Sequence, residues 1–199
     1  MLYSLITGSF FIYFKLFSRV TVTGKENIPK DGAVIFCSNH ISNLDPPLLG
    51  AFTSRKIHFM AKEELFNIPI IGPVLKRCGT FPVKRGMDDR KALKHAFSIL
   101  KEQKGLGIFP EGTRSKTGEL GEAKSGASYF ALKSDSVVIP VSITGTYGLF
   151  KRLTLSYGKP VDLTELKKMK ISSETTTSAT NQIMNEIKEL IKQAKKDEV

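Results

Sequence analysis

Residues 33–47 read Ala-Val-Ile-Phe-Cys-Ser-Asn-His-Ile-Ser-Asn-Leu-Asp-Pro-Pro. The first five are apolar without alternation, which is typical of a strand buried on both faces of a parallel sheet. Asp45 followed by Pro46 resembles a helix N-cap with proline at the first helical position. The segment therefore predicts a buried strand, a short loop and a helix, which is the repeating unit of an α/β fold.

The same alternation of strand and helix continues along the chain. Runs rich in apolar and β-branched residues predict strands at residues 20–23, 33–37, 57–61, 80–83, 106–109, 137–141 and 153–157. Helical spacing predicts helices at residues 46–52, 69–76, 87–103 and 124–133. We therefore expect an α/β fold with a mixed, largely parallel sheet flanked by helices, whose functional sites lie at strand ends.

The C-terminal part predicts a loop followed by a helix. Residues 171–180 are rich in Ser and Thr and indicate a surface loop, whereas residues 181–196 repeat apolar side chains at helical spacing and indicate a docked amphipathic helix. A chain of 199 residues fits one domain, because single cores grow to roughly 250 residues before chains divide. We expect this domain to comprise residues 19–199.

The N-terminal segment, residues 1–18, predicts a separate helix that associates with a membrane. Residues 1–17 contain one charged side chain, Lys15, and many aromatic ones. A membrane-spanning helix needs about 20 apolar residues, so the segment is short for a span and suits a helix lying in the interface. A secretory signal lacks support, since no basic region precedes the apolar run. A helix packed on its own domain remains the alternative.

Charge and cysteine content narrow the function classes. The chain has 30 Lys and Arg against 19 Asp and Glu, a net charge of +11, which indicates an acidic partner such as anionic lipid or a phosphorylated substrate. No nucleic-acid-binding motif accompanies this charge, so we expect no nucleic-acid partner. Cys37 and Cys78 lie in apolar stretches and are predicted to be reduced and buried. The scattered His and Cys residues predict no metal site.

The loop after the first buried strand contains the strongest candidate for catalysis. A carboxylate at Asp45 that meets His40 fixes the imidazole tautomer and leaves the second ring nitrogen free to take a proton from a hydroxyl. That is the base half of a catalytic triad without its serine. The structural alternative is that His40 merely ends a strand and Asp45 merely caps a helix.

Basic and hydroxyl side chains follow other predicted strands. After residues 106–109 come Gly112, Thr113 and Arg114, a loop suited to phosphate because glycine permits close approach and arginine binds oxygens in pairs. An ordinary turn with a solvated arginine is the alternative. Further cations follow two other strands, namely Lys62, Lys84 and Arg85. Parallel strands would gather all these groups at one edge of the sheet.

Four ordered motifs carry a family resemblance. They are the Asn39-His40-x4-Asp45 loop, the block at residues 79–85, the Phe-Pro-Glu-Gly-Thr-Arg-Ser run at residues 109–115, and the Val-Ile-Pro-Val run at residues 138–141. Their order and spacing resemble the glycerolipid acyltransferase family, and within it the bacterial branch that acylates lysophosphatidic acid. The motifs extend over more than half of the chain, from residue 39 to about residue 146.

The resemblance implies a reaction and roles for individual residues. It implies transfer of a fatty acyl group from acyl-coenzyme A or acyl carrier protein, a co-substrate rather than a cofactor, to the sn-2 hydroxyl of lysophosphatidic acid, giving phosphatidic acid. His40 would be the general base and Asp45 its partner, with no covalent acyl-enzyme. Acceptor binding falls to Arg85, Glu111, Gly112 and Arg114, to which Lys62, Lys84 and Thr113 are added here. Pro140 matches a position associated with the acyl donor.

Alternatives remain within and outside this chemistry. The acceptor could instead be glycerol-3-phosphate or another lysophospholipid, since the motifs read the phosphate and not the first acyl chain. A thioesterase or other hydrolase would use the same His40 and Asp45 to activate water or a serine, although the chain has no G-x-S-x-G elbow. The lipid substrate implies a peripheral or monotopic location on the cytoplasmic face of the cell membrane, with an anionic membrane surface as partner.

Overall fold

The computed structural model describes residues 2–84 and 89–197, and its centre is one twisted sheet. The strand order is β1-β7-β6-β2-β5-β3-β4. The bounds are β1 (Arg19–Thr23), β2 (Val34–Ser38), β3 (Ile57–Lys62), β4 (Phe81–Val83), β5 (Gly105–Ile108), β6 (Val137–Gly145) and β7 (Arg152–Tyr157). Every strand predicted from the sequence is therefore present, with bounds that differ by a few residues.

The sheet is mixed and largely parallel, which confirms the predicted fold class. β2 pairs in parallel with β5 and β6, β3 pairs in parallel with β5 and β4, and β1 pairs in parallel with β7. Only the β6–β7 pairing, among the described strands, is antiparallel. β2 is central, and all of its residues are buried, as its unbroken apolar run predicts. The carboxyl ends of β2, β3, β4, β5 and β6 thus meet at one edge, which we call the carboxyl edge.

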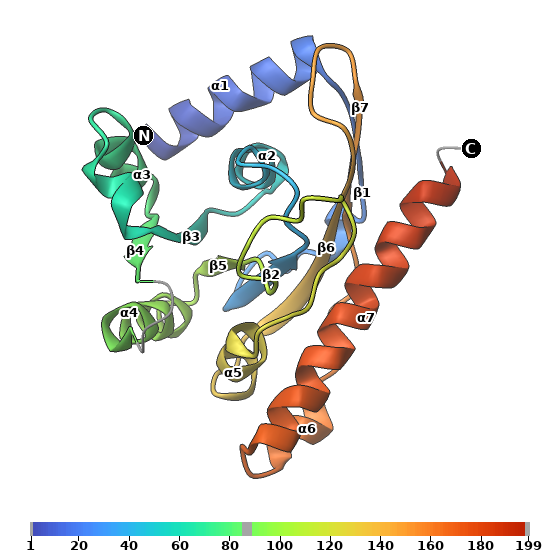
Figure 1. The fold of residues 1–199 in the computed structure, drawn as a ribbon. Coiled ribbons are helices and arrows are strands. Elements are labelled where there is room, and N and C mark those ends of the chain that lie inside the picture. Colours follow the sequence, from blue (N-terminus) through green and yellow to red (C-terminus); the bar gives the residue numbers. More distant parts are fainter. Residues whose placement is uncertain (1, 85–88, 198–199) are drawn as a thin grey trace.

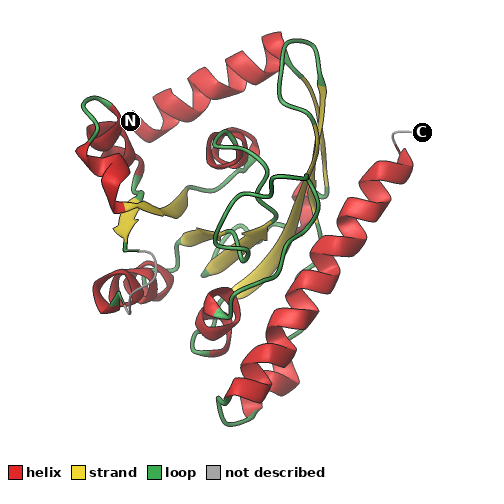
Figure 2. Ribbon diagram, viewed as in Figure 1, coloured by secondary structure: helices red, strands yellow, loops and turns green. Residues whose placement is uncertain are grey.

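Helices cover both faces of the sheet and give three layers (Figure 2). Phe14 of α1 (Leu2–Phe17) and Leu48 of α2 (Asp45–Phe52) pack on one face, against Phe36 and its neighbours. Ala96 of α4 (Arg90–Lys101) and Ile183 of α7 (Ser173–Asp197) pack on the other. The remaining elements are α3 (Ile71–Cys78), α5 (Gly126–Leu132), α6 (Thr164–Lys168) and the 3-10 helices η1 (Lys25–Asn27) and η2 (Glu63–Asn67).

The predicted loop at residues 171–180 is wrong, because α7 begins at Ser173 and includes most of it. The Thr176 hydroxyl donates to the Ser172 carbonyl at 2.6 Å, and the Thr180 hydroxyl donates to the Thr176 carbonyl at 2.8 Å. These back-bonds satisfy hydroxyls that otherwise compete with helix formation. Ala179 is fully buried against the sheet, so tertiary packing outweighs the low helix propensity of the Ser and Thr residues.

Other differences from the sequence expectations are smaller. α4 begins at Arg90, and residues 87 and 88 of the predicted helix lie outside the described residues. Both cysteines are free, but only Cys37 is buried, where desolvation raises its pKa to about 12; Cys78 is half-buried at the end of α3, which corrects the expectation for it.

The edge opposite the carboxyl edge, which we call the amino edge, is closed by Arg55. Its guanidinium donates to the backbone carbonyls of Pro29, Asp31, Gly32 and Gln103 at 2.7 to 3.3 Å. These carbonyls belong to the chain entering β2 and β5. Four donated bonds use nearly all of the donors of the guanidinium, so Arg55 joins the entrances of neighbouring strands.

Candidate active site

The loop after β2 brings His40 and Asp45 into direct contact. Nδ1 of His40 lies 2.6 Å from Oδ2 of Asp45. Because a carboxylate only accepts, Nδ1 carries the proton and Nε2 is the free ring nitrogen, with no described residue bonded to it. The His40 side chain is 12% exposed, and Asp45 is fully buried. The pair therefore has the geometry that a general base with an orienting carboxylate requires.

Asp45 does not cap α2 as predicted, but is the first residue of the helix, and Leu44 holds the cap position. Its side chain turns back to the loop, where Oδ2 accepts from the backbone N–H of Ile41 at 2.7 Å and of Ser42 at 2.8 Å. Oδ1 accepts from the hydroxyl of Tyr147 at 2.7 Å. With His40, four donors compensate the buried negative charge, which would otherwise be costly.

Phe109, at the end of β5, supports the imidazole. Its ring stacks on His40 with centroids 4.0 Å apart and an interplanar angle of 18°. Phe59 of β3 stacks behind Phe109 at 5.9 Å. The imidazole is therefore held on one face by aromatic packing and at Nδ1 by Asp45, which leaves Nε2 as its reactive position.

The loop after β5 is joined to the His40 loop by Glu111, which is 5% exposed. Its Oε1 accepts from the His40 N–H at 2.9 Å, and its Oε2 accepts from the Gly121 N–H at 2.8 Å. In return, the Ser115 N–H donates to the His40 carbonyl at 2.7 Å. The carboxylate of Glu111 is thus occupied by backbone groups and positions the two loops relative to each other.

The outer part of this loop is open to a ligand. Gly112 has φ of 68°, a left-handed conformation that favours glycine, and a Cβ there would lie 3.2 Å from the Lys124 side chain. Thr113 and Arg114 follow it and are exposed. No hydrogen bond or ion pair joins the Arg114 guanidinium to another described residue. This arrangement leaves cationic and hydroxyl groups beside His40 free to bind phosphate oxygens.

The remaining predicted site residues come from other strands. Lys62 ends β3 and Lys84 follows β4, and both are exposed at the carboxyl edge, where Lys84 pairs with Glu63 at 3.7 Å. Pro140 is buried inside β6, opposite Cys37, and its carbonyl accepts from the Gly158 N–H at 2.8 Å. Arg85 lies outside the described residues. The structure therefore brings His40, Asp45, Glu111 and the Arg114 loop together, and among the described residues no hydrogen bond or ion pair links the two lysines or Pro140 to them.

Comparison with known proteins agrees with this geometry. The model of the acyltransferase family matches residues 19–144, which contain the His40 loop, the Arg114 loop and Pro140. This chain belongs to the acyltransferase family.

Named relatives share the sequence to different extents. The chain is 39% identical over 134 residues to the chloroplastic 1-acyl-sn-glycerol-3-phosphate acyltransferase of Arabidopsis thaliana, an alignment covering 65% of this chain and 37% of that protein. It is 31% identical over 195 residues to the 1-acyl-sn-glycerol-3-phosphate acyltransferase of Bacillus subtilis, covering 95% and 96%. It therefore spans little more than a third of the plant relative and nearly all of the bacterial one.

A solved structure supports the same assignment. The crystal structure of the 1-acyl-sn-glycerophosphate (LPA) acyltransferase from Thermotoga maritima superposes with a TM-score of 0.76 at 32% sequence identity. The match covers 94% of this chain and 79% of the Thermotoga chain. The α/β architecture described above is thus that of the acyltransferase family.

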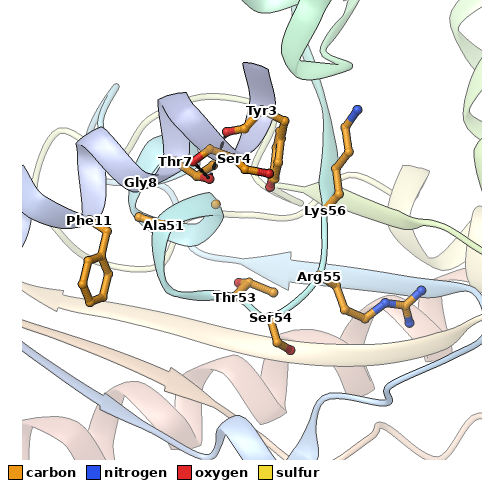
Figure 3. Close-up of a pocket in the computed structure, with 11 residues that line it drawn as sticks. Tyr3, Ser4, Thr7, Gly8, Phe11, Ala51, Thr53, Ser54, Arg55 and Lys56 are labelled. Carbon is orange, nitrogen blue, oxygen red and sulfur yellow. Dashed lines mark hydrogen bonds between the residues drawn. The ribbon is translucent and has the colours of Figure 1, made fainter. Parts of the chain in front are cut away.

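Two cavities lie near the helices of this family member. One, of about 480 Å³, borders the His40 loop and is lined by residues that include Asn39, Ser42, Tyr147 and Lys195. The other, of about 410 Å³, lies between α1 and α2 and contains no predicted site residue. Ser4 and Thr7 line it, while the Arg55 side chain points away from α1 (Figure 3).

Within residues 2–84 and 89–197, no three His, Cys, Asp or Glu side chains gather as a metal site would need.

Sequence reasoning missed three residues at this candidate site. Tyr147 reaches Asp45 across 102 positions, so no local spacing could reveal it. Phe109 begins the Phe-Pro-Glu-Gly motif, but its stacking on His40 depends on how β5 lies beside β2. Lys124 reaches the Gly112 loop because its N–H donates to the Pro110 carbonyl at 2.8 Å. Burial and the Asp45 charge raise the pKa of Tyr147, which keeps its hydroxyl a donor.

Proposed function

We propose that this chain transfers a fatty acyl group from a thioester to the sn-2 hydroxyl of 1-acyl-glycerol-3-phosphate, forming phosphatidic acid. The observation that supports this most is the His40–Asp45 contact of 2.6 Å, with Nε2 free, in a chain of the acyltransferase family. The names of the Arabidopsis, Bacillus and Thermotoga relatives support the acceptor.

The proposed reaction is a direct transfer without a covalent acyl-enzyme. Nε2 of His40 takes the proton from the acceptor hydroxyl as its oxygen attacks the thioester carbonyl carbon. The tetrahedral intermediate collapses, the carbon–sulfur bond breaks, and the leaving sulfur receives the proton back from Nε2. Asp45 stabilises the protonated imidazole during the interval. The products are phosphatidic acid and the free thiol of coenzyme A or acyl carrier protein.

Acceptor binding is proposed to centre on the Arg114 loop. The exposed Arg114 guanidinium, with Thr113 and the Gly112 backbone, would hold the phosphate, and Lys62 and Lys84 would add positive charge along the same edge. Arg85, outside the described residues, is kept as an acceptor contact on the family resemblance alone. Glu111 would act through the loop positions that its carboxylate fixes. Pro140 would shape the donor side from within β6, since it is buried in the sheet.

Membrane association is proposed for residues 1–18, with residues 19–199 as the acyltransferase domain. The small polar residues Ser4 and Thr7 of α1 face α2, whereas Leu5, Ile12 and Leu16 are exposed at 66%, 59% and 62%. Phe14 is fully buried and fixes α1 to the domain, but other large apolar side chains of the helix stay exposed, as a helix lying in a membrane interface requires. None of the described helices has the length and hydropathy needed to cross a bilayer. We place the protein peripherally on the cytoplasmic face of an anionic membrane.

The decisive experiment measures thiol release with and without acceptor. Purified chain is mixed with palmitoyl-coenzyme A or palmitoyl carrier protein, and with lysophosphatidic acid in vesicles. We expect acceptor-dependent release that falls by about 10²- to 10⁴-fold in His40→Ala, because general-base catalysis contributes that much. His95→Ala, which removes an exposed histidine of α4, is the matched control and should retain activity.

The other outcomes separate the alternatives. Release that does not depend on acceptor would indicate a thioesterase. Faster transfer to glycerol-3-phosphate or lysophosphatidylcholine than to lysophosphatidic acid would identify a different acceptor but leave the proposed acyl-transfer reaction in place. Absence of release above the His40→Ala level with either donor would overturn the proposal.

A further inference from the structure

Two loops at the carboxyl edge end in exposed apolar side chains. The first, which we call the β6–β7 tip, is Leu149 and Phe150, exposed at 63% and 61%. The second, the β3–α3 tip, is Ile68, Ile70 and Ile71, of which Ile70 is 80% exposed. Side chains of this size are rarely left in water together at loop ends unless something else covers them.

The two tips flank the catalytic loops. β6, β2, β5 and β3 are consecutive in the sheet and mutually parallel, so their following loops leave the same edge. The inner strands, β2 and β5, carry the His40 and Arg114 loops. The outer strands, β6 and β3, carry the two tips, which lie near opposite ends of α1 (Figure 1). The candidate active site therefore opens between two apolar projections.

Each tip is held in an uncommon backbone conformation. Ile70 and Phe150 have φ of 70° and 57°, and the only other described non-glycine residue with positive φ is Gln103, just before β5. Non-glycine residues adopt this region at a cost, most of all when β-branched. The β6–β7 tip is bonded to the end of α1, because the Phe150 N–H donates to the Phe17 carbonyl at 2.7 Å. Its projection is thus fixed by the fold.

Charge around the tips indicates what covers them. Exposed cations flank both: Lys15, Arg19, Lys151 and Arg152 near the β6–β7 tip, and Lys62, Lys76, Arg77 and Lys84 near the β3–α3 tip. Glu63 and Glu64 also lie there, and Glu63 is paired with Lys84. Apolar tips ringed by cations complement an anionic lipid surface, whereas a second copy of this basic edge would be repelled.

We propose that the β6–β7 tip and the β3–α3 tip insert into the interface of an anionic bilayer and seat the carboxyl edge on it. The tips act in addition to α1 and orient the opening between the catalytic loops toward the lipid. The consequence for catalysis rests on the proposed function, since a lipid acceptor would then reach His40 without leaving the membrane.

The test is vesicle sedimentation of a double variant, Ile70→Asn with Phe150→Asn. Asparagine tolerates positive φ, so both substitutions remove apolar surface and preserve the backbone. With phosphatidylcholine vesicles containing one-third phosphatidylglycerol, we expect the partition coefficient to fall at least about tenfold. Met169→Asn, at an exposed methionine that follows α6 near the amino edge, is the matched control and should stay within about twofold. Pure phosphatidylcholine should weaken binding of the parent chain.

Activity separates this proposal from the proposed function. Transfer to lysophosphatidic acid in vesicles should fall in parallel with binding, while transfer between short-chain, water-dispersed donor and acceptor should be unchanged in the double variant. A chain that transfers no acyl group would refute the proposed function, but its partitioning would still test the tips. Partitioning of the double variant within twofold of the parent overturns the proposal, as does a parent dimer in solution that the two substitutions dissociate.

Discussion

Arg55 and Arg114 lie at opposite edges of the same sheet and are used in opposite ways. The Arg55 guanidinium donates to four backbone carbonyls at the amino edge. The Arg114 guanidinium is exposed at the carboxyl edge and has no hydrogen-bond partner among the described residues. An arginine whose donors serve the backbone stabilises the fold, whereas one whose donors remain free can bind an anion.

The histidines follow the same division. His58, in β3, is 8% exposed, and its Nδ1 lies 3.1 Å from the carbonyl of Gly105, which begins β5 near the amino edge. His40, at the carboxyl edge, has one ring nitrogen on a carboxylate and the other free. Substitutions at the amino edge should therefore alter stability, and substitutions at the carboxyl edge should alter catalysis and binding.

The largest effect is expected for Asp45→Asn at the carboxyl edge. An amide cannot stabilise a protonated His40 and can hold the wrong tautomer, so acceptor-dependent thiol release should fall about 10³- to 10⁴-fold. Asp162→Asn, at an exposed aspartate after β7, is the matched control. Activity of Asp45→Asn within tenfold of the parent would contradict the role of this carboxylate.

Arg55→Met should give the largest loss of stability. The substitution keeps the apolar stem but removes the donors from four carbonyls, and we expect the free energy of unfolding to fall by about 2–3 kcal/mol. Urea unfolding followed by circular dichroism measures this change. At a temperature where the variant is folded, its acyl-transfer rate should remain within twofold of that of the parent chain. A loss of activity without a loss of stability would contradict the assignment of the amino edge to stability alone.

Arg114→Met should show the converse pattern. Loss of the free guanidinium should raise the KM for the phosphate-bearing acceptor about tenfold or more and leave the free energy of unfolding within about 0.5 kcal/mol. Arg114→Lys should recover part of the affinity, because it restores the charge but not the planar fork. Steady-state kinetics over an acceptor series measures both. An unchanged KM would place acceptor recognition elsewhere.

Tyr147→Phe should have a moderate effect through Asp45. Removing one of four donors leaves more negative charge on the carboxylate facing His40, which favours the protonated imidazole. We expect kcat to fall by about three- to tenfold and the acidic limb of the kcat/KM profile to move to higher pH. Burial keeps the pKa of the Tyr147 hydroxyl raised, so its own ionisation adds no limb near neutrality. A limb that stays in place would reduce Tyr147 to a packing role.

His58→Gln should have the smallest effect, confined to the pH dependence of stability. Burial lowers the pKa of His58, although its bond to the Gly105 carbonyl opposes the shift. The unfolded chain then binds a proton near its ordinary pKa, about 6.5, and the folded chain binds it only at lower pH. The contribution of neutral His58 to the free energy of unfolding is therefore complete above about pH 6.5 and is lost as the pH falls below that value. Urea midpoints at pH 7.5 and 5.5 should differ less in the variant, and equal differences would contradict this.

The sequence predicted elements whose signal is local and strong. The strands, the His40–Asp45 spacing and the Gly112–Arg114 loop each depend on a few neighbouring residues, and parallel pairing then gathers them at one edge. The unbroken apolar run of β2 is compatible with few positions other than the centre of the sheet.

The rest depends on contacts between distant parts of the chain. Tyr147 bonds Asp45 and Phe109 stacks on His40 only because β6, β2 and β5 are neighbours. The helical start of α7 is decided by burial of Ala179, which outweighs a polar composition typical of loops. The motif likewise does not reveal that both oxygens of the Glu111 carboxylate accept hydrogen bonds from backbone N–H groups.

The loop between β6 and β7 carries both Tyr147, which is bonded to Asp45, and Phe150, which lies in the exposed β6–β7 tip. Only Gly148 and Leu149 separate them, so the connecting backbone reaches at most about 10 Å. In the proposed membrane-bound state, this short connection limits how far below the lipid headgroups the His40 imidazole can lie. The preference among acceptors then depends partly on the depth in the bilayer at which the acceptor hydroxyl lies. Lengthening the connection by one residue would change that preference without altering any group that touches the substrate.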